Sequence, residues 1–228
     1  MMKRHKNIPL VEYEKGEEFL NTLTHAAGLV LCGLIAAHCL VPAVRAADTM
    51  RAVCASLYLA GTALTFLIST AYHAAKPGAG KRTLRLADHC AIFFAVAGTA
   101  TGTVPAVIDT VGLAPAVAMI VCAWGGAVAG LVCALADFEK TKAVRMILYI
   151  ATAAVCAVCG GGAFKVLPKG AFRALLLGGA LLLTGAALMG LGKKRRYFHC
   201  LFHVFIDAGL TVYYIAIAAY CYSQQPVT

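Results

Sequence analysis

The residue types best suited to metal or proton chemistry lie in two stretches that are far apart in the sequence. His73 and Asp88 stand on either side of a short basic segment in STAYHAAKPGAGKRTLRLADHC, and His199 and His203 lie in YFHCLFHVFID. His199 and His203 are four residues apart, so a helix presents both imidazoles on one face. Together with His73 they offer three neutral nitrogen donors. This set is typical of an open, catalytic zinc site, because structural zinc sites usually have four protein ligands.

Two further residues could take part in chemistry at such a site. Zinc lowers the pKa of a bound water to about 7 and so makes hydroxide available at neutral pH. Asp88 could accept a proton from that water or orient it. Ser69 lies four residues before His73, and on a helix its hydroxyl could bond a ligand, a substrate carbonyl or Asp88. A single histidine at a membrane boundary is usually only an interfacial polar residue, so the hypothesis depends on all four ionisable residues meeting.

A second polar stripe occurs near the start of the chain. Glu17, Asn21 and His25 follow one another at four-residue intervals, so a helix would align them. They either orient the metal ligands and line a cavity, or cap the helix and are solvated at the interface. Asp207 lies one turn beyond His203. It extends the polar site, contributes to a proton path, contacts the metal, or bonds a threonine or tyrosine on a neighbouring helix.

The elements that must position these residues are membrane-spanning helices. Hydrophobic residues make up 61% of the 228 and charged residues 13%, about half the charged share of a soluble domain. A helix needs about 20 apolar residues to cross a bilayer. Seven such stretches predict an all-α integral membrane protein, a single seven-helix domain with a cytoplasmic lead at 1–18. The expected spans are about 20–43, 52–75, 84–105, 113–136, 143–162, 172–192 and 198–222.

The charge distribution predicts the orientation of these spans. With the N-terminus in the cytoplasm, fifteen of the 20 lysines and arginines fall in inside segments and five in outside segments. The positive-inside rule therefore places the N-terminus inside and, with seven spans, the C-terminus outside. His73, Asp88, His199 and His203 then share one depth in the inner leaflet. Ionisable residues within spans usually face a cavity or a partner, so we expect these four to meet.

The ten cysteines are predicted to be reduced packing residues. All of them fall within the expected spans, among small apolar neighbours. Cys156 and Cys159 form a CxxC pair, but no second pair accompanies it, as a four-thiolate zinc site would require.

Several motifs carry a family resemblance over nearly the whole chain. EEFLNTLTHAAG, STAYH, LADHCAIFFAVAGTATG, WGGAVAG and FHCLFHVF occur in this order. Together they resemble the bacterial hemolysin III family, within the progestin and adiponectin receptor superfamily and related to alkaline ceramidases. The resemblance implies a seven-helix bundle with its N-terminus inside and zinc held by His73, His199 and His203. It also implies that Asp88 lies near the zinc-bound water, and it matches Ser69 to a serine shared with alkaline ceramidases.

The chain departs from this family pattern at two positions. Gly102 stands where the pattern has proline after AGTxT, and Asp207 stands where it has an apolar residue. The first departure bears on the shape of the third span. The second adds an acidic group one turn beyond a proposed zinc ligand, so it bears on the extent of the site.

Two classes of function fit these features. The first is a zinc-dependent membrane hydrolase of a lipid amide or ester, with Asp88 as base and then acid. The second is a non-enzymatic protein with structural zinc, either a pore-forming cytolysin or a receptor-like sensor of lipid or energy state. The full ligand set with Ser69 and Asp88 favours hydrolysis, whereas a pore requires a continuous polar stripe that the outer halves of the spans do not show.

The expected partner and location follow from the same features. A membrane lipid, as substrate or as fatty acid, is the expected partner in the bacterial inner membrane. The net charge of +10 is concentrated at the inner ends of the spans, so it indicates topology and not nucleic-acid binding. The second reading of this charge is contact with anionic lipid headgroups.

Overall fold

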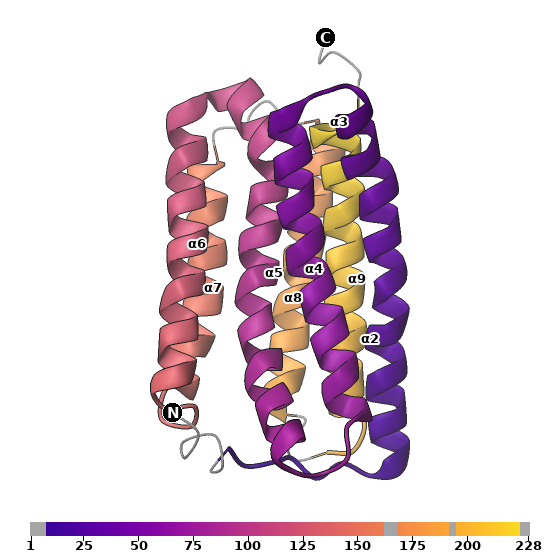
Figure 1. The fold of residues 1–228 in the computed structure, drawn as a ribbon. Helices are drawn as coiled ribbons and strands as arrows, with labels where there is room; N and C mark the ends of the chain where they lie inside the picture. The colour runs from indigo at the N-terminus through magenta and orange to yellow at the C-terminus, as the bar shows by residue number, and fades with distance from the viewer. Residues whose placement is uncertain (1–7, 162–167, 192–194, 224–228) are drawn as a thin grey trace.

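The described part of the chain is a bundle of seven helices that are long and apolar enough to cross a membrane, as predicted (Figure 1). The computed structural model describes residues 8–161, 168–191 and 195–223, and within these ranges it contains no strand. The expected span ends at 162 and 192, and the basic residues at 3–6, 165 and 193–194, lie outside the described residues. The elements are α2 Lys15–Ile35, η1 Ala36–Leu40, α3 Val41–Arg45, α4 Thr49–Ala74, α5 Ala79–Val111, α6 Leu113–Ala136, α7 Lys142–Cys159, α8 Lys169–Leu191 and α9 Phe198–Cys221.

The first span starts earlier and is less regular than the sequence suggests. Helix α2 begins at Lys15, inside the expected lead, because the Glu14 backbone N–H donates to the Glu17 carboxylate at 3.2 Å and so caps the first turn. The helix widens into the π-helical turn η1 just before Pro42. Proline has no N–H to donate to the preceding turn, so a wider turn there accommodates the missing hydrogen bond.

The outer surface of the bundle is apolar. All seven spans have a mean hydropathy of 1.7 to 2.2 over their most apolar windows. Large side chains such as Phe19 and Val158 are 65% and 79% exposed. An apolar surface of this extent is stable in hydrocarbon but not in water. The chain is therefore a multi-pass membrane protein.

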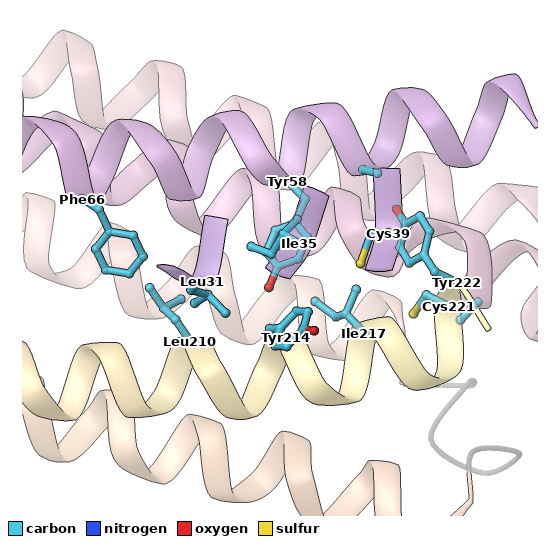
Figure 2. Close-up of a cluster of buried hydrophobic side chains, with 12 residues drawn as sticks. Leu31, Ile35, Cys39, Tyr58, Phe66, Leu210, Tyr214, Ile217, Cys221 and Tyr222 are labelled. Carbon is cyan, nitrogen blue, oxygen red and sulfur yellow. The ribbon is translucent and has the colours of Figure 1, made fainter. Parts of the chain in front are cut away.

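One core cluster joins the helices that carry most of the candidate residues. Figure 2 shows Phe66 and Tyr58 of α4 facing Leu210 and Tyr214 of α9, with Leu31 of α2 between them. Because lipid is as apolar as this core, van der Waals packing and polar contacts stabilise the helix association, and removal from water contributes little. The cluster fixes α2, α4 and α9 relative to one another between the candidate site and the opposite end of the bundle.

Two glycines allow close approach of α4 and α5, the most extensively packed helix pair. A Cβ atom added at Gly61 would lie 2.3 Å from the Phe94 carbonyl oxygen, and one added at Gly98 would lie 2.9 Å from the Leu57 carbonyl oxygen. Only glycine permits this backbone contact, which is a common device in membrane bundles. The contact fixes the α5 backbone, which carries Asp88, against the α4 backbone, which carries His73.

Arg51 joins α4, α5 and α9 at the end of the bundle opposite the candidate site. Its guanidinium donates to the Asp48 carboxylate at 2.8 Å, to the Asp109 carboxylate at 2.5 Å and to the Cys221 carbonyl at 3.2 Å. Asp48 also accepts the Arg51 backbone N–H and so caps α4. The hydrogen bonds that Asp48 accepts from Arg51, chiefly from its backbone N–H and then from its guanidinium, lower the pKa of the Asp48 carboxyl.

The expectation for the cysteines is confirmed. All ten are free thiols. Cys39, Cys54, Cys90, Cys156 and Cys221 are buried among apolar neighbours, as small packing residues are.

Candidate metal centre

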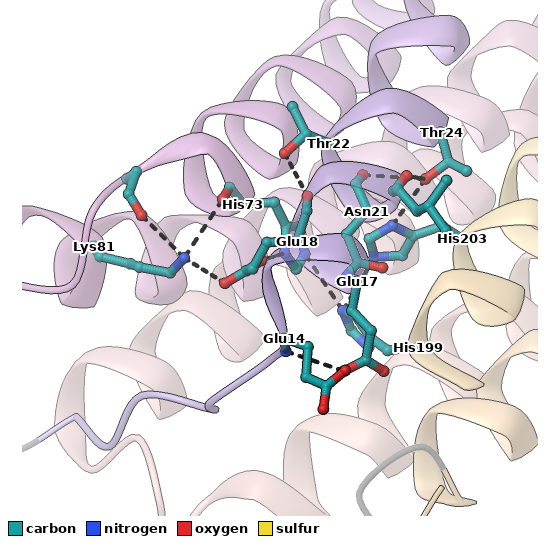
Figure 3. A network of polar contacts seen from close by, with 12 residues as sticks. Glu14, Glu17, Glu18, Asn21, Thr22, Thr24, His73, Lys81, His199 and His203 are labelled. Carbon is teal, nitrogen blue, oxygen red and sulfur yellow. Dashed lines mark hydrogen bonds and ion pairs between the residues drawn. The ribbon is translucent and has the colours of Figure 1, made fainter. Parts of the chain in front are cut away.

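The structure brings His73, His199 and His203 together at one end of the bundle (Figure 3). The Nε2 atom of His199 lies 3.4 Å from Nε2 of His73 and 3.1 Å from Nε2 of His203. Four-coordinate zinc with Zn–N bonds of 2.0–2.1 Å places its nitrogen ligands about 3.3 Å apart. The spacing of these three atoms therefore fits one zinc ion. His73 comes from the end of α4, and the other two come from the first two turns of α9.

His73 is oriented by an acidic residue of α2. Its Nδ1 atom lies 2.7 Å from the Glu18 carboxylate, and the other Glu18 oxygen accepts from the Lys81 ammonium at 2.6 Å. A carboxylate can only accept a hydrogen bond, so Nδ1 of His73 carries a proton and its N–H donates a hydrogen bond to Glu18. The Nε2 lone pair of His73 is then directed at the other two imidazoles. Carboxylate–imidazole pairs of this kind accompany many metal sites.

The ring of His203 is oriented in the same way by a hydroxyl group. The Thr24 hydroxyl lies 3.2 Å from His203 Nδ1 and 2.9 Å from the Leu20 carbonyl. A hydroxyl has one proton, and a carbonyl can only accept it. Thr24 therefore donates to the backbone and accepts from Nδ1–H of His203. The Nε2 lone pair of His203 is also left for an external ligand.

These two tautomers give a test of whether the residues fit a cation. Two Nε2 lone pairs, from His73 and His203, face the same Nε2 atom of His199 at hydrogen-bond distance. His199 has at most one Nε2–H proton, which can satisfy one of them. Three converging lone pairs around one cation satisfy all three nitrogens at once. The donor set therefore fits a metal ion that prefers imidazole, such as zinc.

Glu17 fixes the start of the helix that carries His199 and His203. One of its carboxylate oxygens accepts the Tyr197 backbone N–H at 2.6 Å. Tyr197 precedes α9 and has a left-handed backbone, with φ of 64°. This conformation is uncommon for a residue with a side chain. The hydrogen bond to Glu17 holds this turn in place, two residues before His199.

Tyr13 covers the centre from the side of the lead. Its ring stacks on His199 with the centroids 4.9 Å apart and lies 5.8 Å from the ring of His73. Burial, together with the nearby carboxylates of Glu18 and Asp88, raises the pKa of the Tyr13 phenol, so it stays neutral at physiological pH. Asp88 therefore lies at the same end of the bundle as the three histidines. Its side chain has no hydrogen bond or ion pair with any other described residue. The structure thus brings together the three histidines, and Asp88 is not part of their group.

The remaining predicted residues surround the three histidines. Ser69 is 2% exposed, one turn before His73, and its hydroxyl has no hydrogen-bond partner in the described chain. Asn21 is fully buried, and neither of its amide atoms has such a partner. The His25 ring lies 3.8 Å from the ring of His203, and its Nδ1 atom lies 3.3 Å from the Asp207 carboxylate. Asp207 thus contacts His25.

Three close neighbours of the histidines were not identified from the sequence. They are Thr24, Lys81 and Tyr13. The sequence also gives no specific role to Glu18, the hydrogen-bond partner of His73. Thr24 and Glu18 each lie one position away from the polar stripe on α2, and that adjacency is the only signal the sequence offers. Lys81 belongs to a basic run that reads as a topology signal. It is 4% exposed and bonds Glu18, which nothing in the sequence of this run indicates.

Comparison with known proteins agrees with the motifs. The family model described as Haemolysin-III related matches residues 13–214. The chain is 23% identical over 205 residues to the Hemolysin-3 homolog of Bacillus subtilis (strain 168), covering 90% of this chain and 94% of that one. It is also 23% identical over 204 residues to Hemolysin-3 of Bacillus cereus, covering 90% and 91% of the two chains. Because the family model spans almost the whole bundle and includes all three histidines, the chain belongs to the haemolysin-III-related family.

Proposed function

We propose that His73, His199 and His203 hold a zinc ion and that the protein is a zinc-dependent hydrolase of membrane lipids. The observation that carries the proposal is the convergence of three Nε2 atoms 3.1 and 3.4 Å apart, with two Nδ1 atoms engaged by Glu18 and Thr24. Three protein ligands leave one coordination position open, as in catalytic zinc sites. When bound, zinc supplies Lewis acidity toward a carbonyl and a water of lowered pKa.

The substrate that fits best is a lipid amide or ester with its carbonyl at the inner membrane face. In the proposed reaction, a water oxygen bonds to the carbonyl carbon and the bond to the amine or alcohol breaks, which releases a fatty acid. Asp88 takes the proton from the attacking water and delivers it to the leaving group. Its position near Tyr13, outside the set of three ligands, supports this division of roles. The Ser69 hydroxyl, which has no hydrogen-bond partner among the described residues, is available to hydrogen-bond the substrate.

The proposed location is the bacterial inner membrane, with the N-terminus in the cytoplasm. The seven apolar helices and the excess of basic residues at one end support this orientation. The lipid partner would then reach the centre from the inner leaflet. The apolar outer surface of the bundle supports entry from the bilayer.

The second candidate is a non-enzymatic role, as a cytolytic pore or as a sensor of lipid or energy state, in which zinc is structural. One observation favours it: the histidines and Glu18 tie α2, α4 and α9 together. A metal bound there would stabilise the bundle whether or not it performs catalysis. The name Hemolysin-3 of the Bacillus cereus relative motivates the cytolytic form of this alternative.

A paired measurement on wild type and Asp88→Asn separates the two candidates. Zinc content is measured by elemental analysis, and fatty acid released from a panel of ceramides, acyl amides and phospholipids is measured by mass spectrometry. The hydrolase proposal predicts equal zinc in both proteins and a rate at least about 10²-fold lower in Asp88→Asn. Loss of zinc in the variant would make Asp88 a ligand. Full zinc without turnover in wild type would favour the non-enzymatic role.

A further inference from the structure

A second site is indicated by Arg85, a buried cation with no anionic partner. Its side chain, on α5, is 8% exposed, and its Nη1 atom has no hydrogen-bond partner in the described residues. Its guanidinium makes no ion pair with any described carboxylate. Its Cζ atom lies 5.4 Å from the centre of the Phe138 ring.

A second buried cation lies against the same ring. Arg145 of α7 is 2% exposed, and its Cζ atom lies 4.4 Å from the centre of the Phe138 ring. Its Nη1 atom donates to the Phe138 carbonyl and to the Thr141 hydroxyl, each at 2.7 Å. Its Nε atom has no partner among the described residues. Two guanidinium groups on different helices therefore meet at one aromatic side chain, each with an unused donor.

This arrangement is unfavourable unless an anion binds there. Removing a guanidinium from water without a carboxylate partner is strongly unfavourable. Two like charges around one ring add their mutual repulsion. Contact with the face of Phe138 offsets only part of these costs. An oxyanion that accepts from both guanidinium groups would offset the rest.

The carboxylates of Glu18 and Asp88 do not supply this anion, and Asp137, next to Phe138 in the chain, forms an ion pair with Lys140 at 3.7 Å. The Glu18 carboxylate is engaged by His73 and Lys81. Asp88 lies one turn after Arg85 on α5, but it forms no ion pair with Arg85 or Arg145 within the described chain. The expected topology places both arginines at the depth of the inner-leaflet headgroups, where phosphate is the abundant anion. Basic pockets between helices at this face commonly bind lipid headgroups.

We propose that Arg85 and Arg145 form a phosphate-binding site at the inner ends of α5 and α7, separate from the histidine centre. Guanidinium groups suit phosphate because their planar N–H donors match its oxygens. The phosphate belongs either to an inner-leaflet phospholipid or to a soluble phosphate compound. The irregular segment 8–14 crosses this end, with Ile8 packed in the cluster around Phe138.

Binding to purified protein in a neutral maltoside detergent tests the proposal. The ligands are dihexanoylphosphatidylglycerol, inorganic phosphate, dihexanoylglycerol without phosphate, and hexanoate, all titrated calorimetrically at one ionic strength. Wild type is expected to bind the two phosphate compounds and not dihexanoylglycerol. Arg85→Gln is expected to weaken phosphate binding by about tenfold to a hundredfold, the range for a lost charge-assisted hydrogen bond. Arg145→Lys keeps the charge but loses the fork of donors, so it should weaken binding as well.

Two further variants serve as controls. Arg51→Gln removes a paired arginine at the opposite end of the bundle and should leave phosphate binding unchanged. Asp88→Asn removes a carboxylate one turn from Arg85 on α5, so binding should be retained or tighter. Arg145→Lys and Asp88→Asn keep the test decisive if Arg85→Gln does not fold.

The relative affinities identify the source of the phosphate, and specific results would overturn the site. Phosphatidylglycerol bound tighter than inorganic phosphate indicates a lipid, and equal binding indicates a soluble compound; both results support the site. It would be overturned by phosphate affinity that is unchanged in every folded arginine variant. It would also be overturned if hexanoate bound tighter than inorganic phosphate and lost this affinity in Arg85→Gln. A third contrary result would be dihexanoylglycerol binding as tightly as dihexanoylphosphatidylglycerol.

Discussion

The Nδ1 atom of His73 lies 2.7 Å from the carboxylate of Glu18, so an acidic residue of α2 orients an imidazole of α4. The same carboxylate also accepts from the ammonium of Lys81, which comes from the first turn of α5. Three helices are thereby joined through one side chain, directly beside the converging Nε2 atoms. This relationship fixes the tautomer of His73 and leaves its Nε2 lone pair directed at the other two imidazoles, as the proposed metal site requires.

Replacing Glu18 by glutamine is expected to weaken zinc binding. The amide can still accept from His73 Nδ1–H, but it lacks the negative charge that makes the imidazole a better donor to a metal. We expect about tenfold to a hundredfold weaker zinc affinity, the usual cost of losing such a partner. Competition with a chromogenic chelator measures this change. The matched control is Glu12→Gln, an exposed position in the lead; an equal loss in that variant would show that general charge, and not the hydrogen bond, is responsible.

Replacing Thr24 by valine is expected to have a smaller effect of the same kind. Valine keeps the shape but leaves His203 Nδ1 without its acceptor. Loss of one neutral hydrogen bond corresponds to about threefold to tenfold in zinc affinity. Thr22→Val is the matched control, because the Thr22 hydroxyl donates only to the Glu18 carbonyl, at 2.8 Å. Indistinguishable affinities in the two valine variants would contradict the tautomer assigned to His203.

The helices were predictable from the sequence, but the contacts around the histidines were only partly so. Seven apolar runs identify seven spans, because hydrocarbon thickness sets their length. Spacing and depth indicated that His73, His199 and His203 would meet. The choice between Glu17 and Glu18 as the partner of His73 depends on the rotation of α2 against α4, and side-chain packing in the cluster around Phe66 decides that rotation. The left-handed turn at Tyr197, which Glu17 holds, has no signature in the sequence.

Acid should remove the stabilising contribution of Asp48 at the other end of the bundle. Hydrogen bonds from Arg51 lower the pKa of this carboxyl in the folded protein, whereas the unfolded value is about 3.9. A lowered folded pKa means that the contribution is fully present above pH 4 and disappears as the pH falls through the folded pKa. Asp48→Asn should therefore melt at a lower temperature than wild type at pH 6. This difference should shrink as the pH falls below about 4, as scanning calorimetry can measure; a difference that stays constant with pH would contradict the assignment.

The inner position of the histidine centre depends on the orientation of the bundle. The excess of basic residues at one end predicts that the N-terminus is cytoplasmic and the C-terminus is outside. Alkaline phosphatase fused to the C-terminus should be active, since it folds only outside the cytoplasm, and a fluorescent protein that matures in the cytoplasm should be dark there. The reverse pattern would move the centre to the outer leaflet.

The central claim is tested most directly by the zinc content of protein purified without a metal-affinity tag. We expect about one zinc per chain in wild type, because three imidazoles suit zinc. His38→Ala is expected to match wild type, since the His38 ring bonds Leu34 and Tyr214 far from the centre. His203→Ala should lose most of the zinc and melt at a lower temperature, because a metal that binds only the folded state stabilises it. Wild-type protein that contains no zinc, and whose melting temperature does not change with added zinc or chelator, would contradict the account.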